Sequence, residues 1–319
     1  MEMKKVVNDM RLMVKVCDLY YNQNLSQQEI ASQMDLSRPT VSRLIVSARE
    51  RGIVRISVSN LETIKHWELE RRLEQMYHLK EVLLVDNQPT ESELKTVLGR
   101  AAGRYLESTI KDGSMVGVSM GSTLLEVVNH VRHPEGKNIT VVPLVGGMGQ
   151  LRMELHSNNL AEHLATTYHG TFFPLHAPAR VSSPLVKAEL MKEKSLAKTL
   201  RLTRKLDIAL LGIGCPYKSS SVIATGYYKI NEIETLEKNH VAGDICMQFF
   251  DEDGDTSRFQ KDNNVIGLDI HRLREIPYAI GVAGGEDKFS AIKGAIKGGY
   301  INILITDIKC AEALAAEKG

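Results

Sequence analysis

Apolar positions in the first fifty residues follow a helical period, and two short helices can be placed there from their caps. Ser26 and Glu29 form a capping box, in which the Ser26 hydroxyl accepts from the Glu29 amide while Glu29 reaches back, and this predicts a helix over residues 27–34. Ser37 predicts the start of a second helix over residues 38–51. An earlier helix is indicated by apolar residues at helical spacing, which are Val14, Val16, Leu19 and Tyr20.

The short connection from Asp35 to Ser37 makes the two capped helices a helix-turn-helix. Glycine is common in such a turn, and Asp also tolerates the left-handed backbone that the turn requires. Pro39 in the first turn of the second helix and Gly52 directly after it support the assigned ends. The expected core consists of the small Ala31, where the helices cross, and the apolar side chains of Ile30, Met34, Leu36, Val41 and Leu44.

The outward face at the start of the second helix carries the side-chain types that contact DNA. Short polar side chains and arginine reach base edges and phosphates in a major groove, and here they are Arg38, Thr40, Ser42 and Arg43. Residues 53–58 alternate as a strand would, which predicts a wing with Arg55 near the DNA backbone. We predict that residues 1–60 form a helix-turn-helix domain that binds double-stranded operator DNA. The alternative is a small helical bundle without this function.

The charge distribution favours a contact with phosphates at this end of the chain. The formal net charge of all 319 residues is only +1, yet residues 1–60 hold nine Lys and Arg against six acidic side chains. Between Ser37 and Val58, five arginines stand against the single acid Glu50. A basic stripe on a neutral protein is typical of a module that binds nucleic acid, although many basic faces are merely solvated.

Residues 61–78 set apolar positions among charges and predict a linking helix that pairs with a second copy of the chain. Trp67, the only tryptophan, suits such a contact, and packing against the core is the equal alternative. We expect a homo-oligomer, a dimer or a tetramer, because a dimer presents two recognition helices to two half-sites.

From residue 79 onward, strand-like apolar runs alternate with amphipathic helices. Alternation of this kind predicts an α/β, Rossmann-like domain over residues 79–319, with a mostly parallel sheet covered on both faces. The expected strands are residues 82–85, 115–119, 140–144, 207–212, 278–282 and 303–306. The expected helices are residues 92–109, 122–130, 158–167, 289–297 and 310–318.

Two turns that follow predicted strands are candidates for an anion site, because ligands of such sheets bind beyond the strand ends near helix N-termini. Gly121, Ser122 and Thr123 end one strand and open a helix, although a tight turn without a ligand would look the same. Lys288 opens the helix after a Gly-rich turn, where a cation opposes the helix dipole unless an anion lies between them. A solvated lysine is the alternative. Asp244, before the apolar run 245–250, could accept from sugar hydroxyls or cap a turn.

Composition excludes several other classes of protein. No run of 18–20 apolar residues is present, so no membrane span is expected, and the charged N-terminal residues do not resemble a secretory signal. The four cysteines are far apart and form no C-x-x-C pair, which indicates reduced thiols in a cytoplasmic protein. His130 and His133 stand three apart but lack a nearby carboxylate or thiol, so neither a metal nor another cofactor is expected.

Five segments of the chain resemble SorC-type bacterial transcriptional regulators, a sugar-responsive group that includes the deoxyribonucleoside regulators of Gram-positive bacteria. The segments are LYYNQNLSQQEIASQMDLSRPTVSRLIVSARERGIVRI, GVSMGST, LVGGMG, HVAGDICMQFFDEDGD and GVAGGEDKFSAIKGAIKGGYINILITD, and the resemblance covers nearly the whole chain. It implies an effector domain that resembles sugar-phosphate isomerases in fold and binds phosphorylated sugars.

The resemblance also implies roles for particular residues. The phosphate would be bound by Gly121, Ser122, Thr123 and Lys288, with Asp244 on the sugar hydroxyls. His156 falls near the place where relatives have a polar ligand contact. Val145 stands where several relatives have Lys or Arg, and valine cannot form an imine with an open-chain aldehyde.

These observations predict a DNA-binding transcriptional regulator of a carbohydrate or nucleoside catabolic operon, controlled by a phosphorylated sugar effector. By analogy with the family, a repressor is favoured over an activator. The alternative is a phosphosugar isomerase-like enzyme with an accessory DNA-binding head, which would need a general base. Asp244 and Glu286 are candidates for the base, but no spacing pairs either with an acid, so we expect no enzymatic activity.

Overall fold

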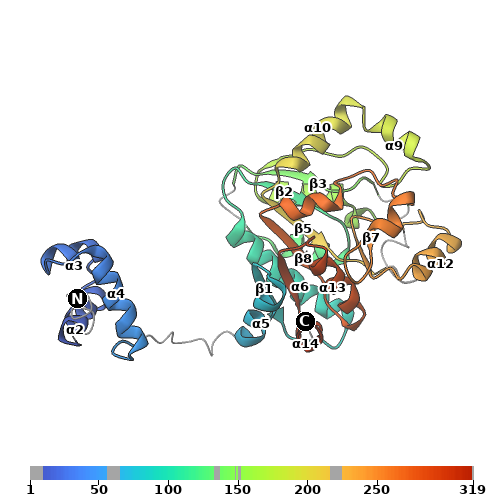
Figure 1. Cartoon of the computed structure of the whole chain (residues 1–319). Helices are drawn as coiled ribbons and strands as arrows, with labels where there is room; N and C mark the ends of the chain where they lie inside the picture. The colour runs from blue at the N-terminus through green and yellow to red at the C-terminus, as the bar shows by residue number, and fades with distance from the viewer. Residues whose placement is uncertain are drawn as a thin grey trace. The chain divides into compact units, whose positions relative to one another are not determined.

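The computed structural model describes residues 10–55, 65–132, 137–147, 149, 152–215 and 225–317. The chain divides into a small unit, Met1–Lys65, and a large unit, His66–Gly319, and each is described here by itself (Figure 1).

The small unit contains three helices, α2 (Met10–Tyr21), α3 (Gln27–Gln33) and α4 (Arg38–Glu50). The capping box is confirmed, because the Ser26 N–H donates to Glu29 Oε2 at 2.8 Å and the Glu29 N–H donates to Ser26 Oγ at 3.3 Å. Ser37 caps α4 through its hydroxyl, which accepts from the Thr40 N–H at 3.3 Å. Local sequence therefore starts both helices of the helix-turn-helix.

The turn between α3 and α4 has the predicted left-handed residue, since Asp35 has φ +54°. The Leu36 N–H then donates to the Ala31 carbonyl at 2.9 Å and closes the turn. Met34 and Leu36 are only partly buried, and Val14 is 49% exposed, because its side of α2 faces outward. The buried core consists of Met13, Val16, Cys17, Ile30, Ala31, Val41, Leu44, Ile45 and Ala48.

The strand predicted over residues 53–58 is wrong in its described part, residues 53–55. The N–H groups of Ile53 and Val54 both donate to the carbonyl of Ala48, at 2.9 and 3.2 Å. Gly52, with φ +70°, allows this reversal, so these residues close the end of α4. Residues 56–58 lie outside the described residues.

Seven parallel strands form the sheet of the large unit, which confirms the α/β prediction (Figure 1). Their order is β1-β9-β8-β5-β2-β3-β4. The chain moves outward from β2 through β3 to β4, then returns to place β5 on the other side of β2. The strands are β1 (Glu81–Val85), β2 (Met115–Val118), β3 (Thr140–Pro143), β4 (Thr171–Phe172), β5 (Ile208–Gly212), β8 (Tyr278–Val282) and β9 (Ile303–Asp307).

Helices cover both faces of this sheet, as an alternating strand–helix sequence requires. Side chains of β5 alternate between two cores, with Ile208 and Leu210 in one and Ala209 and Leu211 in the other. The first core is covered by α6 (Glu91–Thr109), α7 (Ser122–His130) and α8 (Ser157–Thr167). The second is covered by α5 (Trp67–Tyr77), α13 (Phe289–Lys297) and α14 (Ile308–Ala316).

Helix α5, the described part of the predicted linking helix, packs against β1 and α14 of the large unit. Leu73 is fully buried there, whereas Trp67 is half-buried. Two glutamates of α5 bind the outer edge of β1, because Glu74 accepts from the Val82 N–H at 3.0 Å and Glu70 accepts from the Leu84 N–H at 2.9 Å.

Between β4 and β8 the sequence pattern predicted one strand, which is β5, and the structure has further elements there. A hairpin, β6 (Gly243–Ile245) and β7 (Gln248–Phe250), replaces the single apolar run expected after Asp244. The other helices are α9 (Pro184–Leu190), α10 (Lys194–Leu202) and α12 (Ile230–Lys238). Short 3-10 turns are η2 (Met153–Leu155), η3 (Thr203–Lys205), η4 (Ser257–Asp262), η5 (Ile270–Glu275) and η6 (Glu286–Lys288). None of the helices in the described ranges is both long and apolar enough to cross a bilayer.

Candidate functional site

A cavity of about 460 Å³ opens at the carboxyl ends of β2, β5, β8 and β9. The strand order reverses between β2 and β5, and such a reversal is where ligands bind in open parallel sheets. We call this space the effector cavity. Five of the residues singled out from the sequence line it, namely Gly121, Ser122, Thr123, Asp244 and Lys288.

The first wall of the effector cavity is the turn from β2 into α7. Gly121 has φ +117°, a conformation that side-chain-bearing residues rarely adopt, and its N–H donates to the Leu155 carbonyl at 3.1 Å. That bond engages the Gly121 amide inside the protein. The donors that remain for an anion are the partly exposed Ser122 and Thr123 and the first-turn amides of α7, which have no partner within the helix.

Lys288 lies across the cavity, at the end of η6 and directly before α13. Its side chain is half-buried, and its Nζ donates to the Ile213 carbonyl at 3.1 Å. This ammonium group therefore stands between the ends of β5 and β8, beside an N-terminal helix end.

Asp244 is a deeply buried acid of the cavity, with 2% of its surface exposed. Oδ2 accepts from the Met247 N–H at 3.1 Å, whereas Oδ1 has no hydrogen-bond partner among the described residues. Burial raises the pKa of Asp244 to about 6, and the Lys288 charge opposes this rise. A buried carboxylate oxygen without a partner can accept a ligand hydroxyl.

Gly214 permits the position of Asp244. The two backbones pair in an antiparallel bridge, and a Cβ at residue 214 would lie 2.0 Å from Asp244 Oδ1. Gly214, the second glycine of the G-x-G at residues 212–214, is thus required for the close approach of this carboxylate.

The turn of the β6–β7 hairpin is buried and uses two non-glycine residues in left-handed conformations. Cys246 has φ +52° and Met247 has φ +62°. The Cys246 thiol lies 3.4 Å from the Ser119 hydroxyl, and burial raises the pKa of the thiol to about 12. The cysteine is therefore a neutral wall of the cavity rather than a nucleophile.

Sequence reasoning missed Asp307, which shapes the same cavity from the end of β9. Its Oδ1 accepts from the Gly285 N–H at 2.8 Å, so it holds the Gly-rich turn that precedes Lys288. An aspartate directly before a helix is the only sequence signal of this role, since it also caps α14. Other lining residues that were not predicted are Asn87, Glu91, Lys95 and Lys309. Glu286, a candidate base for the alternative enzyme, also lines the cavity.

Two residues named from the family resemblance lie outside this lining. His156 precedes α8 and follows Leu155, whose carbonyl accepts from Gly121, but it is not among the lining residues. Val145 is fully buried and bridges to Gly267. Among the described residues, no group of His, Cys, Asp and Glu is arranged to hold a metal ion, and His133 lies outside them.

The candidate DNA interface is the N-terminal part of α4. Arg38 and Arg43 are exposed, and Thr40 and Ser42 are partly exposed. The Thr40 hydroxyl lies 2.8 Å from that of Ser37, and Arg43 Nε donates to the Pro39 carbonyl at 3.3 Å. Arg55 is exposed after the end of α4 rather than on a strand. Four of the five predicted residues therefore lie in the N-terminal half of α4, and Arg55 lies beyond its end.

Comparison with known proteins decides the family. The family model described as "Putative sugar-binding domain" matches residues 62–316, and that of sigma-70 region 4 matches residues 15–51. The sorbitol operon regulator of Klebsiella pneumoniae is 31% identical over 310 residues, which cover 96% of this chain and 98% of that protein. The chain belongs to the SorC family of transcriptional regulators.

Other SorC-family members agree with this assignment. The deoxyribonucleoside regulator of Bacillus subtilis (strain 168) is 33% identical over 306 residues, covering 95% of this chain and 97% of that protein. The crystal structure of the full-length Klebsiella pneumoniae regulator superposes with a TM-score of 0.75 at 31% identity, covering 97% of this chain and 99% of that one. These similar proteins are transcriptional regulators rather than enzymes, and this SorC-family chain is a DNA-binding regulator with a sugar-binding domain.

Proposed function

We propose that this regulator represses a carbohydrate or nucleoside catabolic operon and that a phosphorylated sugar in the effector cavity releases it from its operator. The relatives named for a sorbitol operon and for deoxyribonucleosides support the operon class. Operator binding would place its action in the bacterial cytoplasm.

The observation that carries the proposal is the pairing of a cation with a helix N-terminus across one cavity. The phosphate would accept from the first turn of α7, including Ser122 and Thr123, and from the Lys288 ammonium group. Asp244 would accept from sugar hydroxyls through its unpartnered Oδ1. Because the phosphate and hydroxyl groups use different walls, the cavity would distinguish a phosphosugar from inorganic phosphate.

Lys288→Ala tests the anion site. Phosphorylated pentoses and hexoses should raise the melting temperature of the wild-type protein, and this shift should disappear in the variant. Lys297→Ala is the matched control, because Lys297 lies on α13, the helix that directly follows Lys288, pairs with Asp253 and does not line the cavity. An undiminished shift in Lys288→Ala would put the phosphate elsewhere.

Residues at the start of α4 would read the operator, and Arg43 is the most informative to change. Arg43→Ala should weaken operator binding by about 1–3 kcal/mol if the side chain contacts a base. Arg43→Lys retains the charge but loses the guanidinium fork, so it separates a base contact from a phosphate contact. Gel-shift affinity equal to wild type in both variants would remove Arg43 from the interface.

Two copies of α4 in a homo-oligomer, a dimer or a tetramer, would meet two operator half-sites. Sedimentation of the protein with and without a phosphosugar would measure the assembly, and a monomer in both states would contradict this part of the proposal.

A further inference from the structure

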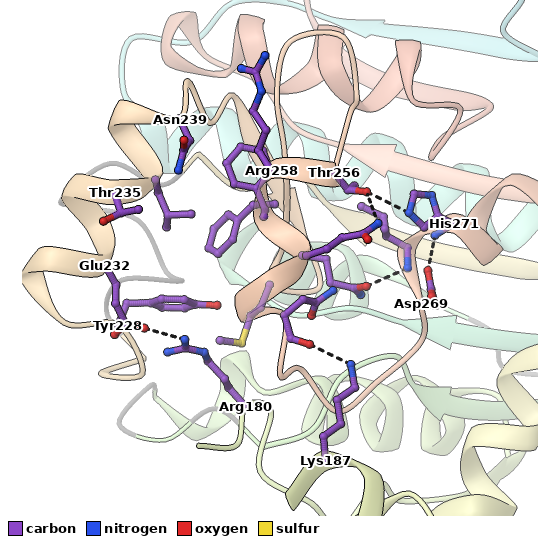
Figure 2. A pocket seen from close by; sticks show the side chains of 18 of the residues that line it. Arg180, Lys187, Tyr228, Glu232, Thr235, Asn239, Thr256, Arg258, Asp269 and His271 are labelled. Carbon is purple, nitrogen blue, oxygen red and sulfur yellow. Dashed lines mark hydrogen bonds and ion pairs between the residues drawn. The ribbon is translucent and has the colours of Figure 1, made fainter. Parts of the chain in front are cut away.

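A second cavity, of about 350 Å³, lies between α12, η4 and the first residues of η5 (Figure 2). Its lining shares no residue with the effector cavity. The volume is at the lower end of the range for small-molecule pockets, which suits a ligand of one or two rings.

One wall of the second cavity is aromatic. The rings of Tyr228 and Phe249 meet edge to face with centroids 5.4 Å apart, and Phe249 meets Phe259 in the same way at 6.4 Å. Leu236 of α12 adds an aliphatic contact. Figure 2 shows the Tyr228 ring extending into the pocket. Such a wall receives the apolar face of a sugar ring or a nucleobase.

Two cations of the second cavity, Arg180 and Lys187, are already bound to other groups of the protein. Arg180 pairs with Glu232 at 2.7 Å and stacks on Tyr228, with its guanidinium carbon 4.5 Å from the ring centroid. Lys187 Nζ donates to the Asn263 carbonyl at 3.1 Å, and burial lowers the pKa of this lysine. The third cation of the lining, Arg258, is exposed to solvent. Because the two more buried cations are already bound, the chemistry of this pocket favours an uncharged ligand.

Hydrogen-bonding groups line the α12 side of the pocket. Within the described part of the chain, the buried Nε–H of Arg180 has no hydrogen-bond partner. The side-chain amides of Asn231 and Asn239 and the Tyr228 hydroxyl line the pocket beside it. On the opposite side of the pocket, the polar side chain of Gln248 is already hydrogen-bonded within the protein. Its amide donates to the Leu268 carbonyl and accepts from the Ile270 N–H. Amides and a hydroxyl beside aromatic rings are the groups that recognise hydroxyl-bearing rings.

The two cavities meet at the buried turn of the β6–β7 hairpin. Asp244 and Cys246 line the effector cavity, whereas Met247 and Gln248 line the second one. The Met247 N–H is the donor that holds Asp244 Oδ2, at 3.1 Å. A ligand that presses on Met247 therefore acts on the carboxylate of the other cavity.

We propose that the second cavity binds an uncharged, hydroxyl-bearing ring compound, of the monosaccharide or nucleoside class, and that its occupancy changes anion affinity in the effector cavity through the turn at residues 244–248. The regulator would then sense two compounds rather than one.

Calorimetry with D-glucose, D-ribose, adenosine and thymidine tests the site. At least one compound should bind the wild-type chain, and Thr235→Trp, which fills the pocket from an exposed position of α12, should weaken that binding by about tenfold or more. Glu234→Trp is the matched control, since this neighbouring exposed residue does not line the pocket, and it should bind as wild type. Absence of binding by all four compounds, or equal binding by Thr235→Trp, overturns the proposal.

Two further measurements separate this proposal from the one for the effector cavity. Lys288→Ala should retain binding of the uncharged compound, and its loss there would place the compound in the effector cavity instead. In the wild-type protein, the compound should change the affinity for inorganic phosphate, and phosphate should change the affinity for the compound by the same factor, of about fivefold or more. Unchanged affinities would overturn the coupling.

Discussion

At the scale of single residues, Asp244 is held in a state that costs folding energy near neutral pH. Its carboxyl group is buried, and one of its oxygens has no partner among the described residues. Burial raises the pKa of this acid from 3.8 to about 6, so the folded protein binds the proton more tightly than the unfolded chain. A ligand that donates to Oδ1 would recover part of this cost.

This burial predicts a pH dependence of stability with a definite sign. Since the folded pKa lies above the unfolded one, the contribution of Asp244 to the free energy of unfolding decreases as pH rises from about 4 to about 6, by at most about 3 kcal/mol. Asp244→Asn should lack this decrease. Urea unfolding at pH 4.5 and pH 7.5 compares the two proteins, and identical changes with pH in both would show that Asp244 does not titrate in this window.

Gly214→Ala should displace the same carboxylate by steric contact. Because the new Cβ would lie 2.0 Å from Oδ1, the variant should lose about 1–3 kcal/mol of stability and most of its phosphosugar binding. Gly147→Ala is the control, since its Cβ would meet only the Ala177 carbonyl at an ordinary 3.6 Å. Thermal shift with and without ligand measures both effects. Similar behaviour of the two variants would mean that Gly214 has room for a side chain.

At the scale of elements, the helix-turn-helix was predictable because its signals are local. Ser26, Glu29 and Ser37 bind amides three residues away, and Asp35 adopts the turn conformation that its side chain tolerates. In its described part, residues 53–55, the predicted wing strand is wrong for a reason that is also local. The N–H groups of Ile53 and Val54 donate to the Ala48 carbonyl, and the alternating pattern of residues 53–58 cannot reveal that competition.

The turn at Asp35 leads to a prediction about the small unit. Asp35→Val should destabilise it by about 1–2 kcal/mol, because a β-branched residue is disfavoured at φ +54°. Asp35→Gly should be nearly neutral, since glycine adopts this conformation freely. Hydrogen exchange of the α3 and α4 amides in the full chain reports the local stability. Faster exchange in the glycine variant than in the valine variant would contradict the assignment.

The β6–β7 hairpin was not predictable from its sequence. Two-residue hairpin turns are usually recognised in a sequence by Asn or Gly. This turn instead has Cys246 and Met247 in left-handed conformations. The apolar run 245–250 therefore gave no sign of a turn within it. The cavity beside Met247 was missed with it, because its walls come from β7, α12 and η4, which only the folded chain brings together.

At the scale of the whole molecule, the strand ends of the sheet were predictable, but their order was not. Residues 121–123 and 288 were placed at strand ends by sequence alone, and the sheet brings them to one cavity because β5 lies between β2 and β8. Asp307 joins them only because β9 pairs with both β8 and β1. Pairing between strands that lie so far apart in the sequence leaves no signal in the residues near either strand.

The proposed control of DNA binding requires a reciprocal effect between the two units. If a phosphosugar weakens operator binding by some factor, the operator must weaken phosphosugar binding by the same factor, typically about 5–150-fold for such coupling. Anisotropy of a labelled operator fragment and calorimetry of the phosphosugar measure the two factors. Lys288→Ala should bind the operator with wild-type affinity, and the phosphosugar should not change that affinity. Unequal factors in the wild type would mean that the binding events are not coupled at equilibrium.

The two glutamates of α5 have a consequence for how the molecule behaves at high concentration. β1 is an outer strand of the sheet, and its outward N–H groups at Val82 and Leu84 are bound by Glu74 and Glu70. Unpaired groups on such a strand would offer a template on which a foreign chain could extend the sheet. Because carboxylates of the same chain accept from both N–H groups, these donors cannot pair with a strand of another chain, and this edge of the sheet is protected from β-aggregation.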